Sequence, residues 1–257
     1  MTPNIFSAAG DGIQRIEIRR ADKRNALTHE MYTALEQAFE RACADDAVRV
    51  VLVLGAPGVF TAGNDIADFI ANPPLDENAP VLRFLRRLSR CEKPVVAGVA
   101  GMAVGIGTTM LLHCDYVVAS EDAQLVLPFV NLGLCPEAAS SLLLPLAIGH
   151  KRASEMLLFG DRIAAATALD WGIVNAVVAN DKLVEAAEKR AAALAAKPPS
   201  ALIATKRLLR RSLAPAIAET LSIESRDFAA LLGSPAAREC LAAFVEKRPP
   251  DPSRFKQ

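Results

Sequence analysis

The chain has 257 residues, of which 52% are hydrophobic, and its 29 lysines and arginines balance its 29 acidic residues. This length is enough for one large domain, or a domain with an appendage, built around a sizeable core. A net charge of zero without a long basic block argues against a nucleic-acid-binding surface.

Three sequence features argue against an exported, membrane-spanning, disulfide-linked or metal-binding protein. The first residues lack the basic, apolar and small-residue order of a signal peptide. The long apolar run at residues 95–112 is interrupted by glycines, which predicts buried strands and helices rather than a membrane span. Five scattered cysteines and three distant histidines form neither a CxxC pair nor a metal-ligand cluster. We therefore expect a cytoplasmic protein with reduced thiols, no metal and no membrane partner.

The first predicted elements are a strand, a helix and a second strand. Residues from Ile13 onward alternate between apolar and polar, which predicts a strand with one buried face. The next segment predicts a helix with Thr28 as N-cap and a single apolar face. That face consists of Met31, Leu35, Ala38, Phe39 and Ala42. The run VRVVLVLGA at residues 48–56 is typical of a parallel strand covered on both sides.

Two more strands are predicted at residues 93–101 and 115–120, with helical stretches between them. Residues 71–80, rich in Pro, Asn and Asp, predict a surface loop beside the functional site. From residue 180 the pattern becomes helical, with one amphipathic helix closed by Pro198 and Pro199 and three more behind it. We expect an α/β core over residues 1–196 and a helical region over residues 197–257.

A first glycine turn, Ala62-Gly63-Asn64, follows a strand and precedes a short helix. Gly63 allows another group to approach closely, and such a turn leaves backbone N–H groups free at the helix entrance. Asp65 and Asp68 are placed to stabilise the start of that helix. The alternative interpretation is an ordinary strand-to-helix turn without a ligand.

A second glycine turn contains Gly101, Gly105 and Gly107 at the entry to an apolar helix. Its spacing matches neither a Walker loop nor a dinucleotide-binding motif. It leaves the amide of Ile106 at the positive end of a helix, although the glycines also permit tight packing alone. Together, the two turns predict a pair of N–H groups that converge on one oxygen, as an oxyanion hole requires.

Five motifs then occur in the order found in the crotonase (enoyl-CoA hydratase/isomerase) superfamily, which the chain resembles over nearly its whole length. They are NALT at 25–28, FTAGNDIADF at 60–69, AVGIGTTMLLHCDYVVAS at 103–120, LGLCPEAASS at 132–141 and DWGIVNAVV at 170–178. The resemblance implies an α/β fold with a spiral core of ββα repeats and a C-terminal α-helical trimerisation region. It also implies a homotrimer or dimer of trimers, an acyl-CoA thioester substrate, and no cofactor besides the CoA of that substrate.

By motif position, the resemblance implies that the amides of Asn64 and Ile106 bind the thioester oxygen. The other implied substrate-binding residues are Lys23, Arg24, Ala26, Ala62, Gly63, Asp65, Ile66, Gly105, Phe129, Leu134, Phe244 and Lys247. Lys23 and Arg24 lie where family members approach the CoA phosphates, or else belong to an ordinary solvated loop. Phe244 and Lys247 resemble a C-terminal pair that reaches a neighbouring CoA site.

The reaction depends on which acids are present. Hydratases of this family typically use two glutamates, and the corresponding positions here hold Thr109 and Phe129. Glu137, directly after Pro136, resembles instead the single catalytic glutamate of Δ3,Δ2-enoyl-CoA isomerases. The chain is thus expected to be an enoyl-CoA isomerase, the alternatives being a hydratase or other crotonase-type enzyme, or a non-catalytic acyl-CoA-binding protein.

Without the resemblance, Pro136 and Glu137 are a favourable first turn of a helix. Apolar neighbours would raise the pKa of Glu137, whereas a helix start would lower it. The sequence leaves the direction of that shift open.

Overall fold

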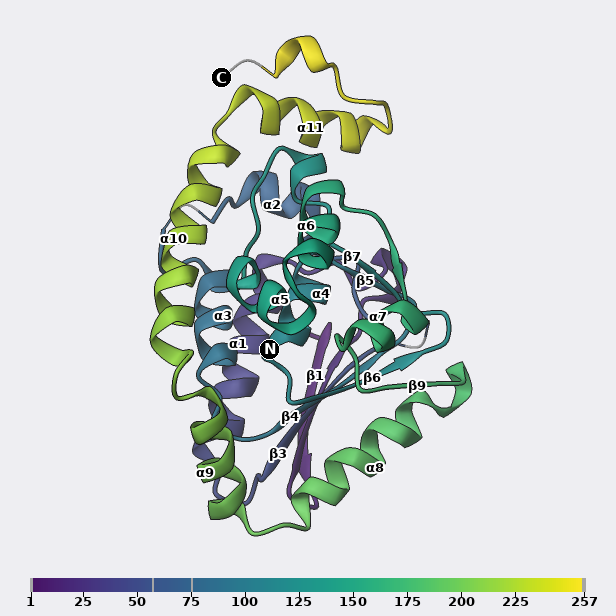
Figure 1. Ribbon diagram of the computed structural model, residues 1–257, viewed down its shortest axis with the longest axis vertical. Helices are drawn as coiled ribbons and strands as arrows, with labels where there is room; N and C mark the ends of the chain where they lie inside the picture. The colour runs from purple at the N-terminus through teal and green to yellow at the C-terminus, as the bar shows by residue number, and fades with distance from the viewer. Residues whose placement is uncertain (1, 57, 75, 256–257) are drawn as a thin grey trace.

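In this computed structural model, which describes residues 2–56, 58–74 and 76–255, two sheets form the core and helices surround them (Figure 1). The larger sheet has the order β1-β2-β3-β4-β6-β9, in which β1 is antiparallel to β2 and the other pairs are parallel. Its strands are β1 (Ile5–Gly10), β2 (Ile13–Ile18), β3 (Val50–Gly55), β4 (Val95–Val99), β6 (Tyr116–Ser120) and β9 (Ala176–Val178). The strand predicted from Ile13 onward and the strands predicted at residues 48–56, 93–101 and 115–120 are confirmed.

Strand β1 was not predicted, because IFSAAG carries little periodic pattern. It forms through a hairpin with β2, in which Gly10 pairs with Ile13 across Asp11 and Gly12. Both turn residues have positive φ, of 52° and 77°, as a two-residue Asp-Gly hairpin turn requires. The smaller sheet contains β5 (Met102–Val104), β7 (Gln124–Val126) and β8 (Ile163–Ala164), with β5 parallel to β7 and β8 antiparallel to it.

The helices of the core are mostly short. They are α1 (His29–Ala44), α2 (Ile66–Ala71), α3 (Pro80–Ser89), α4 (Ile106–Thr109), α5 (Ser140–Ile148), α6 (His150–Phe159), α7 (Ala165–Trp171) and α8 (Leu183–Ala195). Single 3-10 turns are η1 (Ala21–Lys23), η2 (Met110–His113), η3 (Val130–Leu132), η4 (Asn180–Lys182) and η5 (Pro252–Arg254). The predicted N-cap of α1 is confirmed, since the Thr28 hydroxyl accepts from the Met31 amide at 3.3 Å. All five residues of its predicted apolar face are buried.

Helix α8 covers one face of the larger sheet, where its alanines and Leu183 pack on Val50, Leu52 and Val118. The alternate residues of β3, Val51 and Val53, face the other side, where α1 and α3 lie. Strand β3 is therefore buried on both faces, as its continuous apolar run predicts.

The C-terminal region forms α9 (Pro199–Arg210), α10 (Ala214–Leu232) and α11 (Pro235–Glu246), which confirms the predicted helical segments. The buried Lys206 anchors α9 to the core by donating to the Lys93 carbonyl at 2.8 Å and to Asp115 at 2.6 Å. Helix α10 runs alongside α3 (Figure 1). A role of this region in trimerisation stays a prediction.

No single helix among the described residues is long and apolar enough to cross a membrane. Helices α10 and α11 meet the combined requirement of length and apolar composition only when taken together, and a bend of 76° separates them.

Candidate active site

The two glycine turns lie against each other. Thr61 and Ala103 form a parallel bridge, in which the Thr61 amide donates to the Met102 carbonyl and the Val104 amide donates to the Thr61 carbonyl, each at 3.0 Å. Gly63 has a φ of +86°, and a Cβ at this position would lie only 2.8 Å from the Val104 carbonyl oxygen. The close approach of the two backbones therefore requires glycine at position 63.

This pairing brings the amides of Asn64 and Ile106 to the same end of the two segments. Each of these residues lies three positions beyond a bridge residue, Thr61 or Ala103. Among the residues that the structure describes, neither amide donates a hydrogen bond. The side chain of Asn64 is held by the hydroxyl of the buried Tyr32, which donates to its amide oxygen. Two free backbone donors on paired segments are what an oxygen that acquires negative charge requires.

Glu137 does not begin a helix, so the interpretation of Pro136 and Glu137 as a first turn was wrong. Helix α5 begins at Ser140, and Ala138 and Ala139 adopt the left-handed conformation with φ of 61° and 56°. Consecutive left-handed alanines are strained, and such strain persists only where neighbouring groups hold it. Glu137 thus lies in a loop, away from the helix dipole that would have lowered its pKa.

Two buried side chains from distant parts of the chain hold this strained turn. Glu224 on α10 accepts hydrogen bonds from the Ala139 amide at 2.6 Å and from the Ser141 amide at 2.9 Å. His113 contacts the Ala138 carbonyl through Nε2 at 2.7 Å. Burial lowers the pKa of His113 to about 4, so the ring is neutral and its Nε2–H donates to that carbonyl.

Burial raises the pKa of Glu137 to about 8, and the nearby Glu224 adds to the rise. The Oε1 atom of Glu137 is buried and has no hydrogen-bond partner among the described residues. A carboxyl group that lacks compensating donors favours its neutral form. Near neutral pH such a group exchanges a proton readily, which is the property of a general acid and base.

Glu137 and Asn64 line the same small cavity, which has a volume of about 20 Å³ and so holds roughly one water molecule. Its walls come from α2, the following loop, α3 and α10, and they are mainly apolar. The lining residues are Asn64, Phe69, Pro74, Val81, Leu82, Leu85, Glu137, Ala138, Glu224, Ser225 and Phe228. Pro74 belongs to the predicted surface loop at 71–80, which therefore does lie beside the site; Leu75 of that loop is outside the described residues.

The predicted substrate-binding residues of the first two motifs lie side by side. The Ala62 amide donates to the Arg24 carbonyl at 3.0 Å, and the Leu27 amide donates to the Gly63 carbonyl at 2.8 Å. These bonds place Lys23, Arg24 and Ala26 next to the segment 62–66, with Lys23 and Arg24 exposed. Asp65 caps α2, which begins at Ile66, and forms an ion pair with Arg20 at 2.7 Å.

Three predicted positions near the second turn are buried. Phe129 and Leu134 are 5% and 6% exposed, and the Phe129 ring lies 4.0 Å from where a Cβ of Gly105 would be. Thr109 is fully buried, and its hydroxyl has no partner among the described residues. The two positions predicted to correspond to the acids of a hydratase thus hold a buried aromatic ring and a buried hydroxyl.

Phe244 and Lys247 are exposed at the end of α11 and do not line the Glu137 cavity. Conversely, the sequence did not predict that Tyr32 and Glu224 support the site. His113 was considered only as a possible metal ligand. No motif marks these residues, because their partners are brought to them by the fold. Within the described residues, no group of three or more His, Cys, Asp or Glu side chains could hold a metal ion.

Known proteins resemble this chain over nearly its whole length. Residues 8–256 match the family model described as enoyl-CoA hydratase/isomerase. The chain is 33% identical to the 1,2-epoxyphenylacetyl-CoA isomerase of Escherichia coli K12 over 96% of this chain and 97% of that protein. It is 34% identical to the 2,3-dehydroadipyl-CoA hydratase of the same organism, over 92% and 93% of the two chains.

A solved structure from Pseudoalteromonas atlantica, an enoyl-CoA hydratase/isomerase, superposes with a TM-score of 0.92 and 40% identity. The match covers 96% of this chain and 99% of that one. The similarity confirms the predicted α/β fold of the crotonase type.

Proposed function

The chain belongs to the enoyl-CoA hydratase/isomerase family, and from this premise we propose that it isomerises β,γ- to α,β-unsaturated enoyl-CoA with Glu137 as the single acid and base. The observation that carries the proposal is the unpartnered carboxyl group of Glu137 in the same cavity as Asn64. The buried Phe129 and Thr109 support it, because neither can supply a second carboxylate.

In the proposed reaction the thioester oxygen accepts hydrogen bonds from the amides of Asn64 and Ile106. The Glu137 carboxylate removes a proton from C2, and the electron pair of that C–H bond forms a double bond between C2 and the thioester carbon as the C=O electrons move onto oxygen, while the C3–C4 double bond stays in place. The negative charge of the dienolate rests on the thioester oxygen, where the two amides stabilise it. The Glu137 carboxyl then returns the same proton to C4 through the C3–C4 electron pair; the C=O bond re-forms, the C2–C3 double bond is made, and the carboxylate is restored. The reaction needs no cofactor.

Water addition is the second candidate, since several relatives are named as hydratases. A two-acid hydratase mechanism needs another carboxylate that is free to orient water. Glu224 is the other acid of the cavity, but its oxygens accept bonds from the Ser141 hydroxyl and from two amides. This engagement, together with the apolar walls, favours isomerisation over hydration.

A direct comparison of the two reactions tests the proposal. We expect purified protein to convert a β,γ-enoyl-CoA to its α,β isomer at least ten times faster than it hydrates the α,β-enoyl-CoA, a difference of about 1.4 kcal/mol in activation free energy. Faster hydration would identify a hydratase. Tight binding of acyl-CoA without turnover of either thioester would identify a non-catalytic binding protein.

The pH dependence provides an independent prediction. Because only the ionised form of Glu137 is a base, and its pKa is raised to about 8, kcat/KM should rise with pH and level off above that value. Below pH 8 we expect roughly a tenfold fall per pH unit, since the ionised fraction falls by that factor. Initial rates between pH 6 and 9 measure the profile. A profile that is flat over this range would contradict the proposed base.

The assembly and the CoA contacts also remain proposals. The exposed Lys23 and Arg24 are available for the CoA phosphates. Phe244, at 60% exposed, and the exposed Lys247 are available to a neighbouring subunit. This exposure supports the homotrimer, or dimer of trimers, that the C-terminal helices would form.

A further inference from the structure

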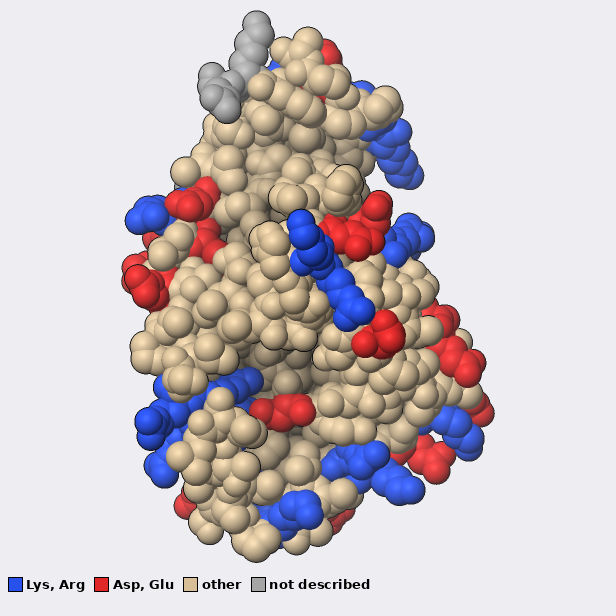
Figure 2. Space-filling view, viewed as in Figure 1, with Lys and Arg blue, Asp and Glu red and all other residues tan. Residues whose placement is uncertain are grey.

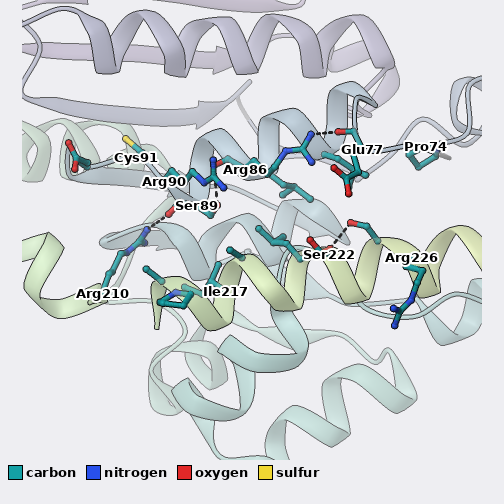
Figure 3. A pocket seen from close by; sticks show the side chains of 18 of the residues that line it. Pro74, Glu77, Arg86, Ser89, Arg90, Cys91, Arg210, Ile217, Ser222 and Arg226 are labelled. Atoms are coloured by element: carbon teal, nitrogen blue, oxygen red, sulfur yellow. Dashed lines mark hydrogen bonds between the residues drawn. The ribbon is translucent and has the colours of Figure 1, made fainter. Parts of the chain in front are cut away.

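The Glu137 cavity adjoins a much larger cavity of about 1030 Å³ between α3 and the C-terminal helices α9 and α10 (Figure 3). Pro74, Leu82, Leu85 and Ser225 line both cavities. The two cavities are therefore neighbours that share one wall, and a ligand held at Glu137 lies beside the larger space. The walls next to the shared residues are apolar, with Leu82 and Leu85 on α3 facing Ile217 and Leu221 of α10.

Charged side chains of both signs line the larger cavity. Glu77 lies at the end near Pro74, together with Arg226, whereas Arg90 and Arg210 lie at the opposite end (Figure 3). The same opposite end is lined by Lys206, Arg207 and Arg211, with Glu92 as its acid. In the space-filling view, blue side chains gather over the junction of α9 and α10 (Figure 2).

Four arginines at this end form no ion pair within the described residues. Lys206 is paired with Asp115, but within the described residues Arg90, Arg207, Arg210 and Arg211 have no acidic group at ion-pair distance. Arg210 donates to the carbonyl oxygens of Ser89 at 3.2 Å and His113 at 2.6 Å, which are neutral acceptors. The far end of the cavity is thus a cluster of guanidinium groups suited to bind an anion.

We propose that the acyl group processed at Glu137 ends in a second carboxylate, which the guanidinium groups of Arg90, Arg207 and Arg211 bind. The substrate class is then an ω-carboxy-enoyl-CoA, a monothioester of a dicarboxylic acid. Its apolar middle section lies against the leucines of α3 and α10. An uncharged methyl end would contact these cations without balancing them, and would remove water from them at a cost.

The helix geometry limits the length of this acyl group. Arg90, which directly follows α3, is five residues beyond Leu85, about 8 Å along the helix axis. Ala214, at the far end of the cavity, is eleven residues from Ser225 on α10, about 16 Å away. The acyl chain must therefore span several methylene groups between the thioester and the terminal carboxylate, and short dicarboxylic chains would not reach the arginines.

Paired substrates of equal carbon number test the proposal. One β,γ-enoyl-CoA ends in a methyl group and the other in a carboxylate, over a series of chain lengths. We expect the carboxylate form to have a kcat/KM at least about tenfold higher at the best length, as one charge-assisted hydrogen bond permits. The Arg207→Gln/Arg211→Gln variant, both of whose side chains are exposed, should remove most of this preference through KM. Equal kcat/KM for both substrates at every length would overturn the proposal.

Arg226→Gln is the matched control, because Arg226 lines the end of the same cavity near Pro74 and pairs with Asp227. It should keep the preference, so a loss equal to that of the double variant would overturn the assignment to the far arginines. Since the substrate class rests on the proposed function, calorimetric binding of saturated acyl-CoA and ω-carboxyacyl-CoA separates the two. Preferential binding of the carboxylate form without isomerisation would support the arginine site and refute the isomerase; equal binding would refute the arginine site alone.

Discussion

Replacing Glu137 with glutamine is expected to lower kcat for β,γ-enoyl-CoA isomerisation by about 1000-fold, within the range for loss of a general acid and base. The amide of glutamine neither accepts the C2 proton nor returns one at C4. The two backbone donors at Asn64 and Ile106 are untouched, so binding of acyl-CoA should persist. The measurement is the initial rate of α,β-enoyl-CoA formation, accompanied by a titration that measures acyl-CoA binding.

The fold should survive this change, because the Glu137 carboxyl group is buried and its Oε1 has no partner to lose. Removing a carboxyl whose pKa is raised to about 8 should also stabilise the protein at high pH. Below about pH 4.5 the Glu137 carboxyl is neutral in both the folded and the unfolded state. As the pH rises to 8, the carboxyl ionises in the unfolded state but keeps its proton in the folded state, so the free energy of unfolding of the wild type falls. The glutamine variant has no such loss. Melting curves of the two proteins at pH 5 and pH 8 check this. If the Glu137→Gln variant isomerised the substrate at the wild-type rate, the proposed mechanism would be refuted.

Replacing Gly63 with alanine is expected to lower kcat by about 100-fold or more, comparable to the loss of one oxyanion donor. The new Cβ would lie 2.8 Å from the Val104 carbonyl oxygen, so the two turns must separate. That separation moves the Asn64 amide relative to the Ile106 amide. KM should change less than kcat, because the two donors act chiefly on the charge of the dienolate.

Gly172→Ala is the control for this prediction. Gly172 has a nearly identical φ, +83° against +86°, but a Cβ there would meet nothing within 4 Å. Both variants should lose roughly 1 kcal/mol of stability from left-handed strain, and Gly63→Ala should lose more because of its contact with Val104, as measured by urea unfolding. Only Gly63→Ala should lose activity. An equal loss of activity in both would show that backbone strain, and not the contact of the two turns, explains the effect.

The elements that could be predicted are those governed by local pattern. Thr28 and the apolar face of α1 follow from helical periodicity, and β3 follows from its continuous β-branched run. The strand β1 could not be predicted, because its stability comes from pairing with β2 rather than from its own residues. The first turn assigned to Pro136 and Glu137 was wrong for a similar reason. The left-handed alanines after Glu137 depend on Glu224, 85 residues away from Ala139.

By itself, the sequence determined the family, the α/β core, the two glycine turns and the glutamate that stands alone between apolar segments. These depend on residue order and on backbone freedom, which a linear pattern records. Only the tertiary structure decided the direction of the Glu137 pKa shift, since burial and the charge of Glu224 exist only after folding. It alone also placed the Glu137 cavity beside a cavity lined by arginines from the C-terminal ends of α3 and α9, because folding brings together residues that are distant in the chain.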